Sequence, residues 1–303
     1  QQPENIGDYR ILRESGRGGM GVVYEAEQQS LGRRVALKVL PHQLVHNDAS
    51  LERFRREARV AAQLHHTNIV PVFEVGQEGV TCYYAMQFIQ GQSLDCVQQE
   101  LARLKGGTAD EQVPASYAYG STAEQQTTQM SQDDTATVTL PGALELSSAS
   151  TNLDHYYQSV ARVGHQVAQA LAHAHDRGVI HRDVKPSNLL LDGQGDVWVA
   201  DFGLAKIGDE AITRTGDVLG TVRYMSPERF KGHCDQRADI YGLGISLYEL
   251  LTLQRAHPSE NHVQLVESIC HREPPPPRAI DPNIPLDLET IVLKAIDKDP
   301  RRR

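Results

Sequence analysis

The strongest constraint on the fold comes from two short polar motifs, HRDVKPSN at residues 181–188 and DFG at residues 201–203, separated by a predicted short hairpin. Aspartates in turns are commonly only caps. This spacing, however, supplies Asp183 as a carboxylate that can orient a hydroxyl nucleophile, and Lys185 as a cation that can face a migrating phosphoryl group. It also supplies an amide oxygen from Asn188 and a second carboxylate from Asp201, which are hard ligands suited to Mg²⁺. The motifs therefore indicate phosphoryl transfer, which depends on positioning and charge neutralisation more than on covalent chemistry.

A glycine-rich segment, GRGGMGVV at residues 16–23, lies between two predicted strands. On its own the pattern is weak, because it arises by chance in roughly one 300-residue chain in ten, and a glycine hairpin turn is the simplest alternative. A dinucleotide-binding fold would need the third glycine to open a helix, whereas the β-branched, alternating sequence VVYEAE follows here. The setting favours a hairpin that covers phosphates, since glycine permits close backbone approach.

A lysine, Lys38, ends the strand-like run VALK about 20 residues after the glycine segment. An isolated strand lysine is usually solvent-facing. Here it could reach the α- and β-phosphates of a nucleotide if a carboxylate held its ammonium group in place. Glu57, beside the apolar stripe of the next predicted helix, is the candidate; otherwise it is an ordinary acid on a helix surface.

Hydrophobic patterning divides the chain into two parts. Residues 9–88 contain β-rich runs around one helical stretch at 51–64, and helical patterns prevail from residue 153, with helices predicted over 239–253 and 286–296. Gly178 stands where the helix that begins near residue 153 should end. The expected buried stripes of the two best-patterned helices are Leu51, Phe54, Ala58, Ala61 and Leu64, and Val160, Val163, Val167, Ala170, Leu171 and Ala174. A small β-rich lobe followed by a helical lobe is α+β in class.

Residues 106–151 separate the two parts and contain no Lys or Arg, and 19 of these 46 residues are Ser, Thr or Gln. Such a stretch offers little apolar surface to offset the entropy of ordering, so we expect an unordered or mobile insert. Its six acidic residues account for six of the nine net negative charges of the chain. The rest of the chain is therefore nearly balanced in charge.

Composition excludes some classes of partner. With 39 acidic and 30 basic residues in 303, the chain lacks the charge of a dedicated nucleic-acid or anionic-membrane binder. Four cysteines, Cys82, Cys96, Cys234 and Cys270, are scattered without metal-site or disulfide spacing, which fits a reducing, cytoplasmic setting. We see no membrane span and no signal peptide, although an anchor in sequence beyond this chain would be compatible with the pattern.

In combination, the glycine loop, VALK, HRDVKPSN, DFG and the SPE at residues 226–228 resemble the protein kinases of the Hanks type. The resemblance covers residues 9–303 apart from the insert. It implies a bilobal fold: an N-lobe (about 9–88) built on a small antiparallel sheet with one helix, and a mainly helical C-lobe (about 152–303), cut near its last helix. Lys185 resembles the serine/threonine branch, and FRREARVAAQLHHTNIV and GTVRYMSPER resemble its bacterial members.

The resemblance also implies roles for individual residues. Asp183 would be the catalytic base, Asn188 and Asp201 the ligands of Mg²⁺ (with Mn²⁺ as an option), and Lys38 and Glu57 the ion pair of the active state. The expected ATP-binding residues are Gly16, Arg17, Gly18, Gly19, Met20 and Gly21 in the glycine loop, Val23, Ala36, Met86 and Leu190 around adenine, and the backbone near Gln87 and Ile89. Two structural roles are implied as well: Glu228 would pair with Arg303, and Asp239 would brace the catalytic loop.

Regulation would centre on Arg182, which in such kinases meets a phosphorylated activation segment. Thr213 and Thr215 occupy the usual autophosphorylation stretch, or are merely polar loop residues, and Thr221 would bond Asp183 and Lys185 beneath the peptide substrate. Three positions depart from the family pattern: Ser15, Gln87 and Gly242. The missing apolar side chain at Ser15 should weaken nucleotide binding by about 1 kcal/mol.

The function expected from the resemblance is that of a non-specific, ATP-dependent serine/threonine protein kinase in signal transduction. Its partners would be protein substrates with Ser or Thr acceptors and a possible second copy of the chain for autophosphorylation. The alternative is a catalytically weak pseudokinase or nucleotide-binding scaffold, which the intact set of catalytic residues disfavours. A small-molecule kinase is disfavoured by the complete GTVRYMSPE segment.

Overall fold

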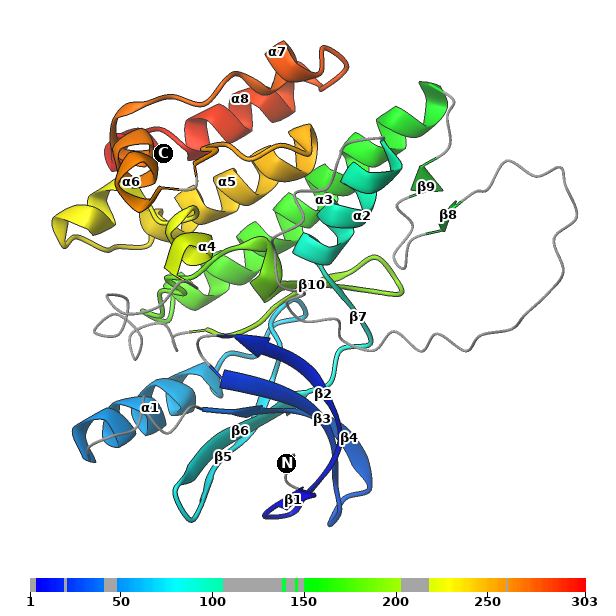
Figure 1. Ribbon diagram of the computed structural model, residues 1–303, viewed down its shortest axis with the longest axis vertical. Helices are drawn as coiled ribbons and strands as arrows, with labels where there is room; N and C mark the ends of the chain where they lie inside the picture. Colours follow the sequence, from blue (N-terminus) through cyan, green and yellow to red (C-terminus); the bar gives the residue numbers. More distant parts are fainter. Residues whose placement is uncertain are drawn as a thin grey trace, which may run out of the picture.

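The fold has two lobes, an N-terminal sheet and a C-terminal group of helices (Figure 1). The computed structural model describes residues 4–18, 21–40, 48–105, 138–139, 145–146, 150–202, 218–259 and 261–303. The family-level expectation of a β-rich N-lobe and a helical C-lobe is confirmed.

The N-lobe is an antiparallel sheet with the strand order β1-β2-β3-β4-β6-β5 among the described residues. Its strands are β1 (Asn5–Ile6), β2 (Tyr9–Gly18), β3 (Gly21–Gln28), β4 (Arg33–Val39), β5 (Val72–Glu78) and β6 (Thr81–Gln87). Successive side chains of a strand point to opposite faces, so the sheet carries two separate apolar clusters. One contains Tyr9, Val35 and Leu37, and the other contains Ala36 and Met86 and faces the C-lobe hairpin.

One helix, α1 (Asp48–Ala61), accompanies the sheet. It begins and ends three residues earlier than the sequence pattern predicts, and residues 62–64 form a turn after it. Ala58, Ala61 and Leu64 are buried as expected, and Arg55 and Arg56 are exposed. The side chains of Leu51 and Phe54 lie outside the described part of the chain.

The C-lobe is organised around α5 (Arg237–Thr252), a helix that is buried along almost its whole length. It packs against α3 (Ser150–His175) and α8 (Leu286–Ala295). All six residues of the predicted stripe on α3 are buried. Gly178 ends this helix with φ +72°, and the amide of Val179 donates back to the carbonyl of Ala174 at 2.9 Å, so the glycine acts as the predicted C-cap.

Further helices complete the C-lobe, and several of them were not predicted from the sequence pattern. They are α2 (Leu94–Leu104), α4 (Val218–Val222), α6 (His262–His271) and α7 (Pro277–Ile280), and the described residues also form 3₁₀ turns at Pro186–Asn188, Pro227–Lys231 and Pro300–Arg302. Among the helices that the structure describes, none is long and apolar enough to cross a membrane.

A small sheet, ordered β11-β10-β7, lies where the lobes meet. The predicted hairpin between the two polar motifs is present as β10 (Leu189–Asp192) and β11 (Val197–Val199), and β7 (Gly91–Ser93) pairs with β10. The hairpin is tied to the N-lobe by a hydrogen bond of 3.0 Å from the amide of Val70 to the carbonyl of Val199. Asn188 and Asp201 therefore flank one rigid element, just before β10 and just after β11.

The acidic insert is described only in part. Within residues 106–151 the structure describes β8 (Val138–Thr139) paired with β9 (Glu145–Leu146), and the first residues of α3. The remainder of the segment for which we predicted disorder lies outside the described residues.

Candidate active site

The loop that carries Asp183 is held from below by a buried carboxylate. Asp239, near the start of α5, accepts hydrogen bonds from the amide of His181 at 2.8 Å and from the amide of Arg182 at 2.7 Å. Arg182 adopts φ +70°, a conformation that is unfavourable for a non-glycine residue and needs such external support. This confirms the prediction that Asp239 braces the catalytic loop.

A histidine ring links the two polar motifs. Nδ1 of His181 accepts the amide of Asp183 at 3.2 Å, so its Nε2 carries the proton and donates to the carbonyl of Ala200 at 2.8 Å. The ring also packs on Phe202 with centroids 4.6 Å apart. The backbone that bears Asp183 and the backbone that precedes Asp201 are thus fixed relative to each other.

Asp183 lies within a compact polar cluster. Its Oδ2 is 2.9 Å from Nζ of Lys185 and accepts a hydrogen bond from Nδ2 of Asn188 at 3.1 Å. Nδ2 of Asn188 also donates to the Asp183 carbonyl at 2.7 Å, and Lys185 donates to Oγ1 of Thr221 at 3.0 Å. The predicted bond of Thr221 with Lys185 is confirmed. The predicted direct bond of Thr221 with Asp183 is not seen between these two described residues, which are joined only through Lys185. Lys185 and Asn188 both contact Oδ2 of Asp183. Oδ1 of Asp183 is therefore the oxygen that can accept a proton from a substrate hydroxyl.

Asp201 receives its partners from the N-lobe. Its Oδ2 is 2.7 Å from Nζ of Lys38, and its Oδ1 accepts a hydrogen bond from the hydroxyl of Tyr84. Burial acts to raise the pKa of Asp201, but the Lys38 ammonium and the hydrogen bonds from Lys38 and Tyr84 outweigh it and lower that pKa below its usual value. Asp201 is therefore ionised at neutral pH. The side chain of Glu57 lies outside the described residues, so its pairing with Lys38 stays a prediction.

The donor set of Asn188 and Asp201 fits a divalent cation. Because both amide protons of Asn188 are directed at Asp183, its Oδ1 is left as the ligand atom. An amide oxygen together with an ionised carboxylate is the kind of oxygen donor set that Mg²⁺ and Mn²⁺ accept in nucleotide sites. The residues present thus fit the metal that the sequence analysis expects.

The four predicted adenine-pocket residues belong to one apolar cluster, although they come from four strands. Val23, Ala36 and Met86 are contributed by the N-lobe sheet and Leu190 by the C-lobe hairpin, and each is at most 2% exposed. Ala36 and Met86 are direct neighbours across β4 and β6. Leu190 lies far along the chain from the other three residues, so the cluster forms only when the lobes pack on each other as they do here.

The rest of the predicted nucleotide-binding segment is placed in part. Gly18 pairs with Gly21, so the glycine segment is a tight strand-to-strand hairpin and not a helix start; Gly16 is buried and Arg17 pairs with Glu14 at 2.7 Å on the surface. Gly19 and Met20 lie outside the described residues.

The predicted adenine-edge segment runs from β6 into the junction between the lobes. The amide of Gln87 donates to the carbonyl of Pro71 at 2.9 Å, and Ile89 is buried in the same apolar cluster as Met86. The carbonyl of Gln87 is consequently the group of that residue that could meet an adenine donor.

The structure explains why glycine stands at position 242. A Cβ on this residue of α5 would lie 2.6 Å from the carbonyl oxygen of Val184, which is closer than real Cβ contacts. The glycine lets α5 approach the catalytic loop. Ser15, another departure from the family pattern, is buried on β2.

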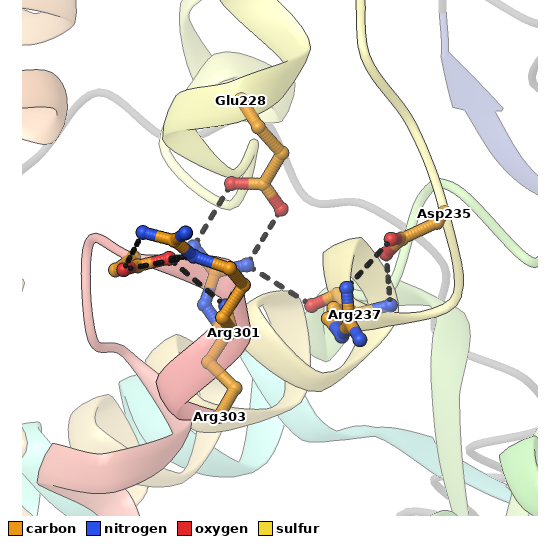
Figure 2. Close-up of polar contacts among 6 residues, drawn as sticks. Glu228, Asp235, Arg237, Arg301 and Arg303 are labelled. Carbon is orange, nitrogen blue, oxygen red and sulfur yellow. Dashed lines mark hydrogen bonds and ion pairs between the residues drawn. The ribbon is translucent and has the colours of Figure 1, made fainter.

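The segment that ends in SPE is anchored to the C-lobe by an ion pair (Figure 2). Arg303 binds both carboxylate oxygens of Glu228, at 2.6 and 2.9 Å, and also donates to the carbonyl of Arg237 at 3.1 Å. The Arg303 side chain is fully buried. Burial acts to raise the pKa of Glu228, and the bonds from Arg303 outweigh it and lower that pKa. The predicted Glu228–Arg303 pair is confirmed.

Of the predicted regulatory residues, Arg182 and Thr221 are described, whereas Thr213 and Thr215 lie outside the described residues. The carbonyl of Arg182 accepts a hydrogen bond from Arg229, a residue that the sequence analysis did not single out. Arg229 follows SPE directly, so it adds a second guanidinium beside the catalytic loop.

Tyr84 is a second site residue that the sequence motifs did not indicate. It precedes the adenine-pocket residue Met86 by two positions on β6 and pairs with Lys38 on β4. Residues two apart on a strand share a face, and paired residues on neighbouring strands point the same way. Strand register, once predicted, would have placed the Tyr84 side chain beside Lys38.

Comparisons with known proteins agree with this geometry. Residues 9–303 match the family model of protein tyrosine and serine/threonine kinases. The chain is 33% identical to serine/threonine-protein kinase PrkC of Bacillus subtilis, over 98% of this chain and 38% of the relative. It is 33% identical to serine/threonine-protein kinase pkn3 of Myxococcus xanthus, over 97% of this chain and 47% of the relative. It is also 33% identical to serine/threonine-protein kinase PknA of Mycobacterium tuberculosis, over 98% of this chain and 58% of the relative.

The chain thus spans between about two fifths and three fifths of the length of these relatives. The match to the family model covers both lobes and every motif that carries site chemistry. The family uses ATP with a divalent metal ion. This chain belongs to the protein tyrosine and serine/threonine kinase family.

Proposed function

We propose that this chain is the catalytic domain of an ATP-dependent serine/threonine protein kinase. The observation that carries the proposal is the convergence of Lys38, Asp183, Asn188 and Asp201 from both lobes, with Asp183 and Asp201 fixed through the single ring of His181. The relatives named serine/threonine-protein kinases support the choice of acceptor.

In the proposed reaction, Oδ1 of Asp183 accepts the proton of a serine or threonine hydroxyl and orients its oxygen towards the γ-phosphate of ATP. Lys185, 2.9 Å from that carboxylate, faces the charge that moves with the phosphoryl group. Asn188 and Asp201 would hold the divalent ion, which neutralises phosphate oxygens when it is bound. Lys38 would turn from Asp201 towards the α- and β-phosphates and towards Glu57.

The catalytically weak alternative finds no support at the described positions. A pseudokinase typically lacks one of the charged groups needed for positioning, whereas Lys38, Asp183, Asn188 and Asp201 are all present and their side chains converge.

Several finer features belong to the proposal. We infer that Mg²⁺ is the working metal and that the domain acts in the cytoplasm on protein substrates without inserting into a membrane. We also infer autophosphorylation at Thr213 or Thr215 between two copies of the chain, with the phosphate meeting Arg182, because added phosphate is stabilised by arginine clusters. We also propose that residues 9–303 form one kinase domain, with the N-lobe at about residues 9–88 and the C-lobe at about residues 152–303.

The test is transfer of labelled phosphate from ATP to a generic protein substrate and to the chain itself, with and without a chelator of divalent ions. The expected products are phosphoserine and phosphothreonine, absent with the chelator, and mass spectrometry should find phosphate on Thr213 or Thr215. Nucleotide binding without any transfer would favour the scaffold, and phosphotyrosine alone would contradict the proposed acceptor.

A further inference from the structure

A tyrosine from the N-lobe contacts the metal-ligating carboxylate of the C-lobe. Tyr84 is 1% exposed, and its hydroxyl donates to Oδ1 of Asp201 across 117 residues of sequence. Its ring lies 5.9 Å from Nζ of Lys38, its neighbour across β4 and β6. Tyr84 belongs to the same buried apolar cluster as Met86, and from there its hydroxyl contacts the carboxylate of Asp201.

The two oxygens of Asp201 are divided between two donors of the same sheet. Oδ1 accepts from Tyr84, and Oδ2 is 2.7 Å from Lys38. Asp201 itself adopts φ +63°, which is costly for an aspartate and persists only when its surroundings fix it. Two donors on two different oxygens set the rotation of the carboxylate, which one donor alone cannot do.

We propose that Tyr84 is a positioning residue that holds Asp201 in the orientation in which it binds the divalent metal of the metal–nucleotide complex. The inference rests on the proposed function. An ionised carboxylate offers about four acceptor sites, so the bonds from Tyr84 and Lys38 leave room for a cation. When Lys38 turns to the phosphates of bound nucleotide, the Tyr84 hydroxyl is the donor that keeps the carboxylate oriented.

The alternative is that the bond is purely structural. In that case the Asp201 carboxylate only provides the acceptor that the buried Tyr84 hydroxyl needs. The two readings predict different effects of removing the hydroxyl. If Tyr84 only fills space behind the nucleotide, Tyr84→Phe leaves metal dependence unchanged, because the phenylalanine ring fills nearly the same volume. If Tyr84 positions Asp201, the loss falls on the metal-dependent part of nucleotide binding.

The experiment measures the affinity of a non-hydrolysable ATP analogue by calorimetry, with and without Mg²⁺, for the unaltered chain and for Tyr84→Phe. Metal-free affinity should be equal. The gain in affinity on adding Mg²⁺ should fall by about tenfold, the size expected for one hydrogen bond to a charged group. The Mg²⁺ concentration for half-maximal phosphoryl transfer should rise by a similar factor, and kcat should recover at saturating Mg²⁺.

The matched control is Tyr83→Phe. Tyr83 is the preceding residue on β6, also buried but on the opposite face, where it packs edge-on against Tyr9 at 5.6 Å. This variant should keep the unaltered metal dependence, and thermal melts should show both variants folded.

The inference is overturned if folded Tyr84→Phe keeps the Mg²⁺ response of the unaltered chain, if it loses affinity equally with and without metal, or if it binds the metal complex more tightly. Any of these outcomes in a chain that still transfers phosphate leaves the proposed function standing. An unaltered chain that transfers no phosphate contradicts the proposed function instead.

Discussion

At the scale of single residues, the site depends on charged groups that are buried and paired. Glu228 and Arg303 show why such pairs matter. Their attraction does not by itself make the fold more stable than apolar residues would, because both groups lose hydration. Removal of one partner, however, leaves the other charge buried and unpaired. The pair therefore makes the position of the SPE turn depend on one arginine.

We predict that Arg303→Ala lowers the free energy of unfolding by roughly 3 kcal/mol or more, because Glu228 is only 11% exposed. Arg303→Lys should give an intermediate loss, since lysine keeps the charge but lacks the two-pronged geometry. Urea unfolding measures both. Arg301→Ala is the control. Arg301, labelled in Figure 2, pairs with Asp299 and has a side chain that is 81% exposed, so its removal should cost less than about 1 kcal/mol. Equal losses for Arg301→Ala and Arg303→Ala would contradict this account.

At the scale of elements, α5 connects the catalytic loop to the segment expected to bind substrate. Asp239 braces the loop at one end of the helix. At the other end, Oε2 of Glu249 accepts a hydrogen bond from Tyr224, which lies between Thr221 and SPE, at 2.7 Å. Burial raises the pKa of Glu249 to about 7. The single helix α5 thus holds both the loop that carries Asp183 and the segment that contains Tyr224 and SPE.

The raised pKa of Glu249 gives a pH dependence with a definite sign. A carboxyl that binds its proton more tightly in the folded state stabilises the fold below its unfolded pKa, and this contribution is lost as the pH rises towards the folded pKa. Relative to Glu249→Gln, the unaltered chain should lose roughly 3 kcal/mol of unfolding free energy between about pH 4.5 and pH 7.

Denaturant unfolding of both chains across that range checks the prediction. The difference between the chains is the quantity to measure. Burial lowers the pKa of His257 to about 4, and this residue acts in the opposite direction in both chains. A difference that stays constant with pH, or that changes in favour of the unaltered chain at higher pH, would show that Glu249 is not the source.

Elements with strong periodicity were predictable from sequence, and those defined by distant partners were not. The stripe of α3 and its Gly178 cap were readable because their pattern is local. β7 is short and is a strand because it pairs with β10, which comes much later in the chain. In α2 the buried residues Leu94, Val97 and Leu101 follow helical spacing, but the helix is short and no side chain caps its start by a hydrogen bond. The same contrast holds in the site. The motif residues could be identified from local sequence, whereas the position of Tyr84 beside Lys38 follows only from the register of β4 and β6.

At the scale of the whole molecule, the two lobes supply complementary halves of one site. The N-lobe contributes Lys38, Tyr84 and most of the apolar adenine pocket, and the C-lobe contributes Asp183, Asn188 and Asp201. The strand hairpin β10–β11 carries Leu190 into that pocket and delivers Asn188 and Asp201 at its two ends. Only the closed pair of lobes brings all these residues together, which explains why the family motifs are spread over most of the chain.

The most direct test of the central claim compares phosphoryl transfer by the unaltered chain and by Asp183→Asn, with Asp287→Asn, an exposed change at the start of α8, as the control. Asparagine keeps the shape but cannot take the proton of the acceptor hydroxyl. We predict that Asp183→Asn lowers kcat by at least about a thousandfold, equivalent to about 4 kcal/mol, with nearly unchanged nucleotide affinity. Asp287→Asn should keep full activity. Transfer by folded Asp183→Asn at a rate close to that of the unaltered chain would contradict the claim that Asp183 is the catalytic base.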